Sequence, residues 1–85
     1  MIYKITIKKS AVKSLKNISE PYYSKIKTQI YKLSKNPRPQ GYEKLKGRDG
    51  YRICVASYRI IYDIFDNELV VDVIALGHRK DIYKH

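Results

Sequence analysis

The stretch from Tyr51 to Tyr83 constrains the fold of this chain more than any other. It contains three runs rich in isoleucine, valine and tyrosine, separated by short polar breaks such as Ala56-Ser57 and Asp66-Asn67. β-Branched and aromatic residues favour strands, and short breaks between such runs favour turns. The stretch therefore predicts consecutive antiparallel strands. Arginines lie inside and just after them, where strand propensity gives no reason for them.

The first part of the chain predicts a strand and then a helix. Residues 2–7 alternate, with Tyr3, Ile5 and Ile7 pointing to one side, as in a half-buried strand. Residues 9–17 follow helical spacing, with Val12 and Leu15 on one face and lysines on another.

A second helix is predicted after this one. Ser19 is a suitable cap, and Glu20 is favourable in the first turn. The helix should end near Ser34 or Lys35, because Asn36-Pro37-Arg38-Pro39 cannot continue it. Its apolar stripe consists of Tyr22, Tyr23, Ile26, Ile30 and Leu33.

These elements together predict an α+β fold. An N-terminal strand and a helical hairpin pack on a mostly antiparallel sheet of four or five strands, followed by a short C-terminal tail. Residues 43–46 are a candidate edge strand, and Asp49-Gly50 is a turn signal before Tyr51. With 85 residues, the chain is expected to form a single domain over residues 1–85.

The charge of the chain indicates the kind of partner it binds. Eighteen lysines and arginines against eight acidic residues give a net charge of +10, which favours nucleic acid, an acidic protein or an anionic membrane surface. The single cysteine, Cys54, excludes an internal disulfide and fits a reducing cytosol. The N-terminus lacks the apolar core of a signal peptide, and no apolar run reaches membrane-spanning length, so we expect a cytoplasmic protein.

Counting residues outward from the two predicted turns shows which side chains should share a face of the sheet. If both polar breaks are two-residue hairpin loops, Cys54 lies opposite Arg59, and Phe65 lies opposite Glu68; a bulge would change the count. The almost wholly apolar face then collects Tyr51, Ile53, Val55, Tyr58, Ile60, Tyr62, Ile64, Leu69, Val71, Val73 and Ala75. The opposite, mixed face collects Arg52, Cys54, Arg59, Ile61, Asp63, Phe65, Val70, Asp72, Ile74 and Leu76.

Two interpretations of the mixed face are open. The arginines could be solvated residues paired with Asp63 and Asp72, or they could form an anion site. A face that is half apolar and half cationic suits a lone monomer poorly. This favours an acidic, partly apolar partner over it, although a tail that folds back would also serve.

The order and spacing of several short motifs resemble the RelE/ParE superfamily of toxins, most closely its RelE branch. The resemblance spans nearly the whole chain. The motifs are Lys44-Leu45-Lys46-Gly47, Gly50-Tyr51-Arg52-Ile53, Tyr58-Arg59-Ile60-Ile61-Tyr62, Gly77-His78-Arg79 and Tyr83.

The resemblance implies a toxin of a type II toxin–antitoxin system. Such a toxin would be a ribosome-dependent endoribonuclease that cuts mRNA in the decoding site, held inactive in a hetero-oligomer with an acidic, RelB-like antitoxin. The family's catalytic positions fall on Arg52, Arg59, Arg79 and Tyr83. RNA contacts are expected from Lys46, Arg48, His78 and Lys80.

The chemistry of RNA cleavage agrees with such a set. In-line attack of the ribose 2′-hydroxyl needs stabilisation of charge on the phosphorane, a proton acceptor and a proton donor. Guanidinium forks match phosphate oxygens, and no metal or other cofactor is needed. The carboxylates and the two histidines have no ligand-like spacing.

One position departs from the family pattern. Cys54 stands where many relatives carry a basic residue, which leaves the proton acceptor unassigned, because arginine stays protonated. His78, Tyr83 and a ribosomal group are the candidates, and His78 has a suitable unperturbed pKa.

Two other functions are open on the sequence. A ParE-like toxin would poison DNA gyrase without cutting RNA, although that branch typically lacks the arginine and tyrosine set. A basic module that binds RNA or the ribosome without catalysis is the second, and the cysteine departure leaves room for it. Growth arrest on expression separates the toxins from the binding module.

Overall fold

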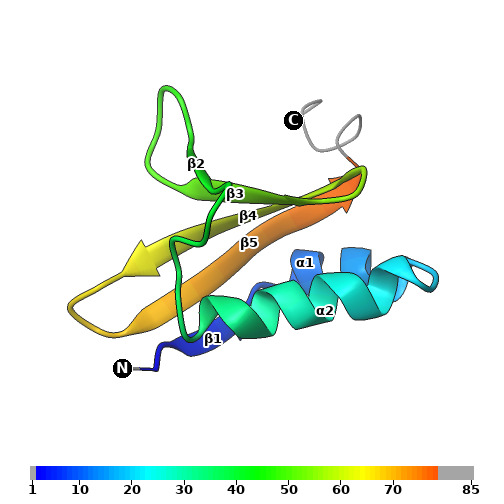
Figure 1. Cartoon of the computed structure of the whole chain (residues 1–85), viewed down its shortest axis with the longest axis horizontal. Coiled ribbons are helices and arrows are strands. Elements are labelled where there is room, and N and C mark those ends of the chain that lie inside the picture. Colours follow the sequence, from blue (N-terminus) through cyan, green and yellow to red (C-terminus); the bar gives the residue numbers. More distant parts are fainter. Residues whose placement is uncertain (1, 79–85) are drawn as a thin grey trace.

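The computed structural model describes residues 2–78 (Figure 1). Both helices lie on the same face of a sheet whose described part has five strands. The elements are β1 (Lys4–Ile7), α1 (Lys9–Lys16), α2 (Tyr22–Leu33), β2 (Glu43–Lys44), β3 (Tyr51–Val55), β4 (Tyr58–Phe65) and β5 (Val70–His78). The predicted C-terminal tail lies outside the described residues.

The sheet has the strand order β1-β5-β4-β3-β2. The pairs β2–β3, β3–β4 and β4–β5 are antiparallel. Strand β1 pairs parallel with β5 and is followed by the two helices. This confirms the predicted α+β class and the mostly antiparallel sheet. The predicted edge strand over residues 43–46 is present but shorter, because only Glu43 and Lys44 pair with β3.

The core lies between the helices and the sheet. Apolar side chains at helical spacing on α1 and α2 meet alternate side chains of the strands, as the two periodicities require. The buried set is Ala11, Leu15, Ile26, Ile30, Leu33, Ile53, Val55, Ile60, Tyr62, Val71, Val73 and Leu76. Ile5 and Ile7 of β1, and Tyr3 just before it, pack against this core, as predicted.

The start of α2 differs from the prediction. Ser19 does not cap the helix with its side chain; its backbone carbonyl accepts from Tyr22 and Tyr23 at 3.1 and 3.2 Å, and the helix begins at Tyr22. Glu20 caps the first turn instead. Its carboxylate accepts hydrogen bonds from the Ser24 backbone N–H at 3.0 Å and from the Ser24 hydroxyl at 2.7 Å. These bonds lower the pKa of Glu20.

The hairpin of β3 and β4 has the predicted register. Val55 lies opposite Tyr58 and Cys54 opposite Arg59 across the two-residue loop Ala56-Ser57. Ala56 adopts a positive φ of 55°, which the tight turn requires.

The hairpin of β4 and β5 corrects the predicted register. Its loop contains the four residues Asp66 to Leu69, so that Phe65 lies opposite Val70 and not Glu68. Leu69, predicted to point into the core, sits in this turn with a φ of 54°. A bulge follows, since Tyr62 pairs with Val73 but Ile61 pairs with Ala75.

The bulge exchanges the faces of the last residues of β5. Leu76 was predicted on the mixed face but is buried in the core, with 4% of its surface exposed. Ala75 was predicted inward and lies opposite Ile61 on the outer face. The outer face is therefore less apolar than the sequence predicted.

Side chains distant in sequence hold the loops at one end of the sheet. The Arg38 guanidinium donates to both carboxylate oxygens of Asp66, at 3.2 and 2.9 Å, and the Tyr3 hydroxyl donates to the same carboxylate at 2.7 Å. The buried Tyr62 hydroxyl donates to the Pro37 carbonyl at 2.7 Å. These contacts anchor the segment after α2, which leads into β2.

In the part of the chain that the structure describes, no helix has the length and apolar character needed to cross a membrane.

Candidate active site

The outer face of the sheet, opposite the helices, brings two of the predicted arginines together. Arg52 comes from β3 and Arg59 from β4, and strand alternation places both on the side away from the core. They lie on adjacent strands, because Cys54 is the direct partner of Arg59 and is two residues from Arg52. The prediction that these side chains share a face is thus realised in the fold.

A loop rich in glycine shapes the edge beside Arg52. It connects β2 to β3, and the Leu45 N–H donates to the Gly50 carbonyl at 3.0 Å. Gly47 and Gly50 have φ angles of 77° and 129°, which favour glycine. The loop presents Lys46 and Arg48 as exposed side chains at this edge.

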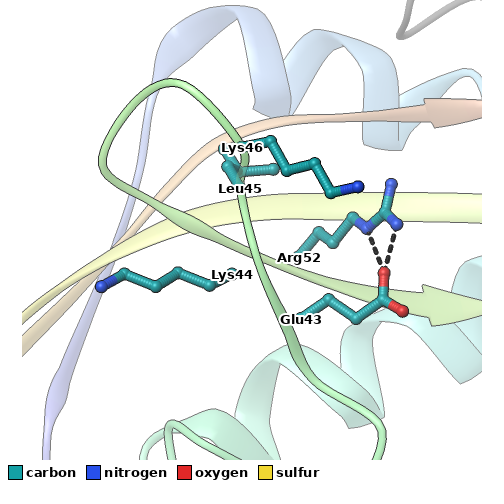
Figure 2. Close-up of a pocket in the computed structure, with 5 residues that line it drawn as sticks. All are labelled: Glu43, Lys44, Leu45, Lys46 and Arg52. Atoms are coloured by element: carbon teal, nitrogen blue, oxygen red, sulfur yellow. Dashed lines mark hydrogen bonds and ion pairs between the residues drawn. The ribbon is translucent and has the colours of Figure 1, made fainter.

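An open cleft of about 690 Å³ lies at this edge and is lined by Glu43, Lys44, Leu45, Lys46 and Arg52. Figure 2 shows the Lys46 side chain directed toward the Arg52 guanidinium, whereas Lys44 extends to the opposite side. The cleft therefore offers two cations to one ligand. Its basic side chains and open shape suit a phosphate chain better than a small apolar molecule.

A carboxylate also lies in the cleft. Glu43 is the cross-strand partner of Arg52 and accepts a hydrogen bond from its Nε at 2.7 Å and another from its terminal nitrogen (Figure 2). The Glu43 side chain is 57% exposed and that of Arg52 29% exposed. An ion pair in such contact with solvent is weak, so a phosphate can compete for the guanidinium.

Arg59 contacts Cys54, the residue at which this chain departs from the family pattern. One of its terminal nitrogens lies against the Cys54 sulfur, directly across the two strands. A thiol is a weak acceptor and carries no positive charge, so Cys54 neither competes strongly for the guanidinium nor adds a cation.

The two aspartates of the outer face do not pair with these arginines. Asp72 accepts from the Thr6 hydroxyl at 2.8 Å and lies 3.2 Å from the Lys8 ammonium. Asp63 lies opposite Asp72, and burial followed by the Asp72 charge raises the pKa of Asp63, against the lowering effect of Arg48. The interpretation of Arg52 and Arg59 as partners of these aspartates is therefore wrong.

His78 lies on the other side of the sheet from the arginines. It is the last residue of β5, opposite Tyr58, and their rings meet edge to face with centroids 5.8 Å apart. The residue opposite Arg59 is Gly77. His78 is therefore not among the residues that line the cleft. Arg79, Lys80 and Tyr83 lie outside the described residues.

Glu43 is the residue of the cleft that the sequence did not reveal. The feature that could have indicated it is its pairing with Arg52 across the two strands. That pairing can be predicted only when the length of the connecting loop is known. Across residues 2–78, no three His, Cys, Asp or Glu side chains gather as a metal site would require.

Comparisons with known proteins identify the family. The model of the family described as the ParE toxin of type II toxin-antitoxin system, parDE, matches residues 5–83. The mRNA interferase toxin RelE of Escherichia coli K12 is 29% identical over 83 residues, which cover 94% of this chain and 86% of that protein.

Solved structures agree. A chain of the archaeal RelE-RelB complex from Pyrococcus horikoshii OT3 superposes with a TM-score of 0.84 at 28% identity, covering 95% of this chain and 99% of that one. For the intact E. coli RelBE toxin-antitoxin complex the TM-score is 0.78 at 28% identity, with 89% and 95% covered. The chain thus belongs to the RelE/ParE superfamily of type II toxin–antitoxin toxins, close to the RelE branch.

Proposed function

We propose that this toxin is an endoribonuclease that cuts mRNA in the A site of the ribosome and thereby stops translation. The observation that carries the proposal is the cleft in which Lys46 and Arg52 meet a carboxylate, with Arg59 on the same face of the sheet. Two relatives at 29% identity, from E. coli and Shigella flexneri, are named mRNA interferases, which supports the same reaction class.

The proposed step is an attack of the ribose 2′-hydroxyl on the adjacent phosphorus. The bond from the 2′ oxygen to phosphorus forms, and the bond from phosphorus to the 5′ oxygen breaks, which leaves a 2′,3′-cyclic phosphate and a 5′-hydroxyl. Arg52 and Arg59 bind the non-bridging oxygens, where negative charge develops. The step exchanges one phosphorus–oxygen bond for another and moves two protons, with no change of oxidation state, so no redox partner enters it.

Glu43 is the proposed proton acceptor. It is a carboxylate in the cleft and already contacts the guanidinium that would bind the phosphate. When the phosphate displaces it from Arg52, its oxygens can accept the proton of the attacking hydroxyl. The leaving 5′ oxygen takes its proton from the Lys46 ammonium.

The remaining predicted residues have supporting roles in this proposal. Arg79 and Tyr83 complete the catalytic set that the family resemblance implies. Arg48 and Lys80 bind flanking phosphates, and His78 contacts RNA at the end of β5.

The partner of the toxin is proposed to be an acidic, RelB-like antitoxin. Structural neighbours are the RelE-RelB complex from P. horikoshii and the RelBE toxin-antitoxin complex from E. coli. The net charge of +10 favours an acidic chain over the arginine face. We propose a cytoplasmic toxin–antitoxin hetero-oligomer in which the antitoxin keeps RNA away.

The test is toeprinting of a short mRNA on programmed ribosomes. Wild-type protein should produce cuts in the decoding site, and Arg52→Ala or Arg79→Ala should lower the cleavage rate about 100-fold or more, since each removes a donor to the phosphorane. Lys4→Gln, at the far edge of the sheet, is the matched control and should cut normally.

A second toxin activity is distinguished by the same assay. The matching family model is described by its ParE member, which favours DNA gyrase as the alternative target. Growth arrest in cells together with uncut mRNA would support gyrase poisoning. Absence of both would leave a binding module without catalysis.

A further inference from the structure

Two tyrosine rings and a guanidinium lie behind the Glu43–Arg52 pair, on the helix side of the sheet. The Tyr42 and Tyr51 rings meet with centroids 6.0 Å apart, and the Arg38 guanidinium lies 5.4 Å from the centre of the Tyr51 ring. We call these three side chains the stack. Tyr42 directly precedes Glu43 in the chain, and Tyr51 directly precedes Arg52. Because successive side chains of a strand point to opposite faces, each member of the ion pair has a stacked ring on the reverse side of its own strand.

Strand β2 needs a contact of this kind. It contains two residues, Glu43 and Lys44, both exposed, and they form two pairs with β3. A ladder so short and so exposed opens easily. Contacts between side chains of paired strands, and between aromatic rings above all, oppose such opening. The Tyr42–Tyr51 contact therefore links β2 to β3 beside the residue on which the proposed chemistry depends.

The stack is itself anchored to the body of the protein. The Arg38 guanidinium donates to both carboxylate oxygens of Asp66, at 3.2 and 2.9 Å. On its other side, the Tyr51 ring stacks on the buried Tyr62 with centroids 5.9 Å apart. The Tyr51 ring is thus held between the core and the β4–β5 loop, and it offers Tyr42 a fixed surface.

On the outer face, the ion pair alone does not fix Glu43. Its carboxylate accepts from the Arg52 Nε at 2.7 Å (Figure 2), but its side chain is 57% exposed, and ion pairs in such contact with solvent are weak. Catalysis tolerates little displacement, since a misplacement of about 1 Å can cost about 100-fold in rate. The position of the carboxylate therefore depends on how firmly the backbone of β2 is held.

We propose that Tyr42 is a positioning residue of this toxin, whose ring contact with Tyr51 holds Glu43 in place beside Arg52. Tyr42 acts through Glu43 and not on the RNA itself. The role in the reaction rests on the proposed function, in which Glu43 takes up the proton of the attacking hydroxyl.

The first measurement is single-turnover cleavage of mRNA on programmed ribosomes by the full chain. Tyr42→Leu removes the ring and should lower the maximal rate about 10- to 100-fold, with the half-saturating toxin concentration unchanged. Tyr42→Phe keeps the ring and should restore the rate. Tyr31→Leu makes the same replacement at a ring of α2 that is 69% exposed, and it should cut normally.

The second measurement does not use activity. The Arg52 Nε–H donates to a carboxylate, and such a charge-assisted bond slows exchange of its proton with water. NMR of the free wild-type protein should show this signal, and Tyr42→Phe and Tyr31→Leu should keep it. Tyr42→Leu should lose it, because β2 then no longer holds Glu43 against Arg52. Circular dichroism checks each fold, and Tyr42→Met replaces Tyr42→Leu in both measurements if the leucine variant does not fold.

The two measurements separate the possible outcomes. An unchanged Arg52 Nε–H signal in Tyr42→Leu would overturn the inference, and so would equal losses in Tyr42→Leu and Tyr42→Phe, which would assign the effect to the hydroxyl. Slower cleavage with the signal intact would also overturn it, because Tyr42 would then act elsewhere than on Glu43. Wild-type protein that shows the expected NMR pattern but cuts no mRNA would reject the proposed function while supporting the contact by which Tyr42 holds Glu43.

Discussion

At the scale of the residue, Glu43 decides whether the cleft is catalytic. Glu43→Gln keeps the shape of the side chain and an acceptor for Arg52 but removes the capacity to take up a proton. We expect single-turnover cleavage on programmed ribosomes to fall about 100-fold or more, with binding unchanged, because general-base catalysis contributes on this order. Glu68→Gln, in the exposed β4–β5 loop, is the control. Full activity of Glu43→Gln would place the proton acceptor elsewhere.

Tyr62 is a second residue with a specific consequence, here for stability. Its buried hydroxyl donates to the Pro37 carbonyl, so Tyr62→Phe leaves that carbonyl without its donor and should cost about 1–3 kcal/mol in the free energy of unfolding. Tyr31→Phe, whose ring is exposed, should cost much less. Urea denaturation measures both, and equal losses would contradict the role of the hydroxyl.

The same tyrosine makes stability depend on alkaline pH. Burial raises the pKa of Tyr62 to about 12, whereas an unfolded tyrosine ionises near pH 10. Between these values the unfolded chain loses a proton that the folded chain keeps, so stability falls as the pH rises. Tyr62→Phe should flatten this part of the pH profile.

At the scale of the element, Gly50 sets how the β2–β3 connection meets the sheet. A Cβ at Gly50 would lie 2.9 Å from Leu45 Cδ1 and 3.3 Å from Asp63 Oδ1, at a φ of +129°. Gly50→Ala should lower the free energy of unfolding by about 1–3 kcal/mol. Gly47→Ala has a φ of +77° and open space, so it isolates the backbone strain. Similar losses for the two variants would show that the steric contact is unimportant.

At the scale of the whole molecule, the Arg38–Asp66–Tyr3 cluster joins the N-terminus, the segment after α2 and the β4–β5 loop. The Arg38 guanidinium and then the Tyr3 hydroxyl lower the pKa of Asp66. A carboxyl group whose pKa is lower in the folded chain stabilises the fold at pH values above its pKa in the unfolded chain, about 3.9. This stabilisation is lost as the pH falls through the pKa of the folded chain.

Asp66→Asn tests this linkage. The variant should be less stable than wild type at pH 7, and the difference should shrink below about pH 4, as protonation removes the same charge from the wild type. Thermal unfolding at a series of pH values measures it. A difference that is constant from pH 7 to pH 2 would mean that the charge of Asp66 is not what holds the cluster.

Much of this architecture could be predicted because it follows from periodicity within single segments. Alternation along β1 and β3 and the helical stripe of α2 selected the core residues apart from Tyr22, which is exposed, since one buried face is enough to decide which side chains point inward. The two-residue turn at Ala56-Ser57 then placed Arg52 and Arg59 on one face, because pairing across a tight hairpin is counted locally.

The tertiary structure alone decided what depends on contacts between distant segments. The β4–β5 turn begins at Asp66, whose carboxylate accepts hydrogen bonds from Arg38 and Tyr3. The bulge beside Ile61 changes the pairing of β5, so that Leu76 points into the core and His78 lies opposite Tyr58 on the helix side of the sheet. Glu43 enters the cleft only because its loop returns the chain to pair with Arg52. Local sequence patterns do not predict such contacts, because the contacting residues come together only when the whole sheet has formed.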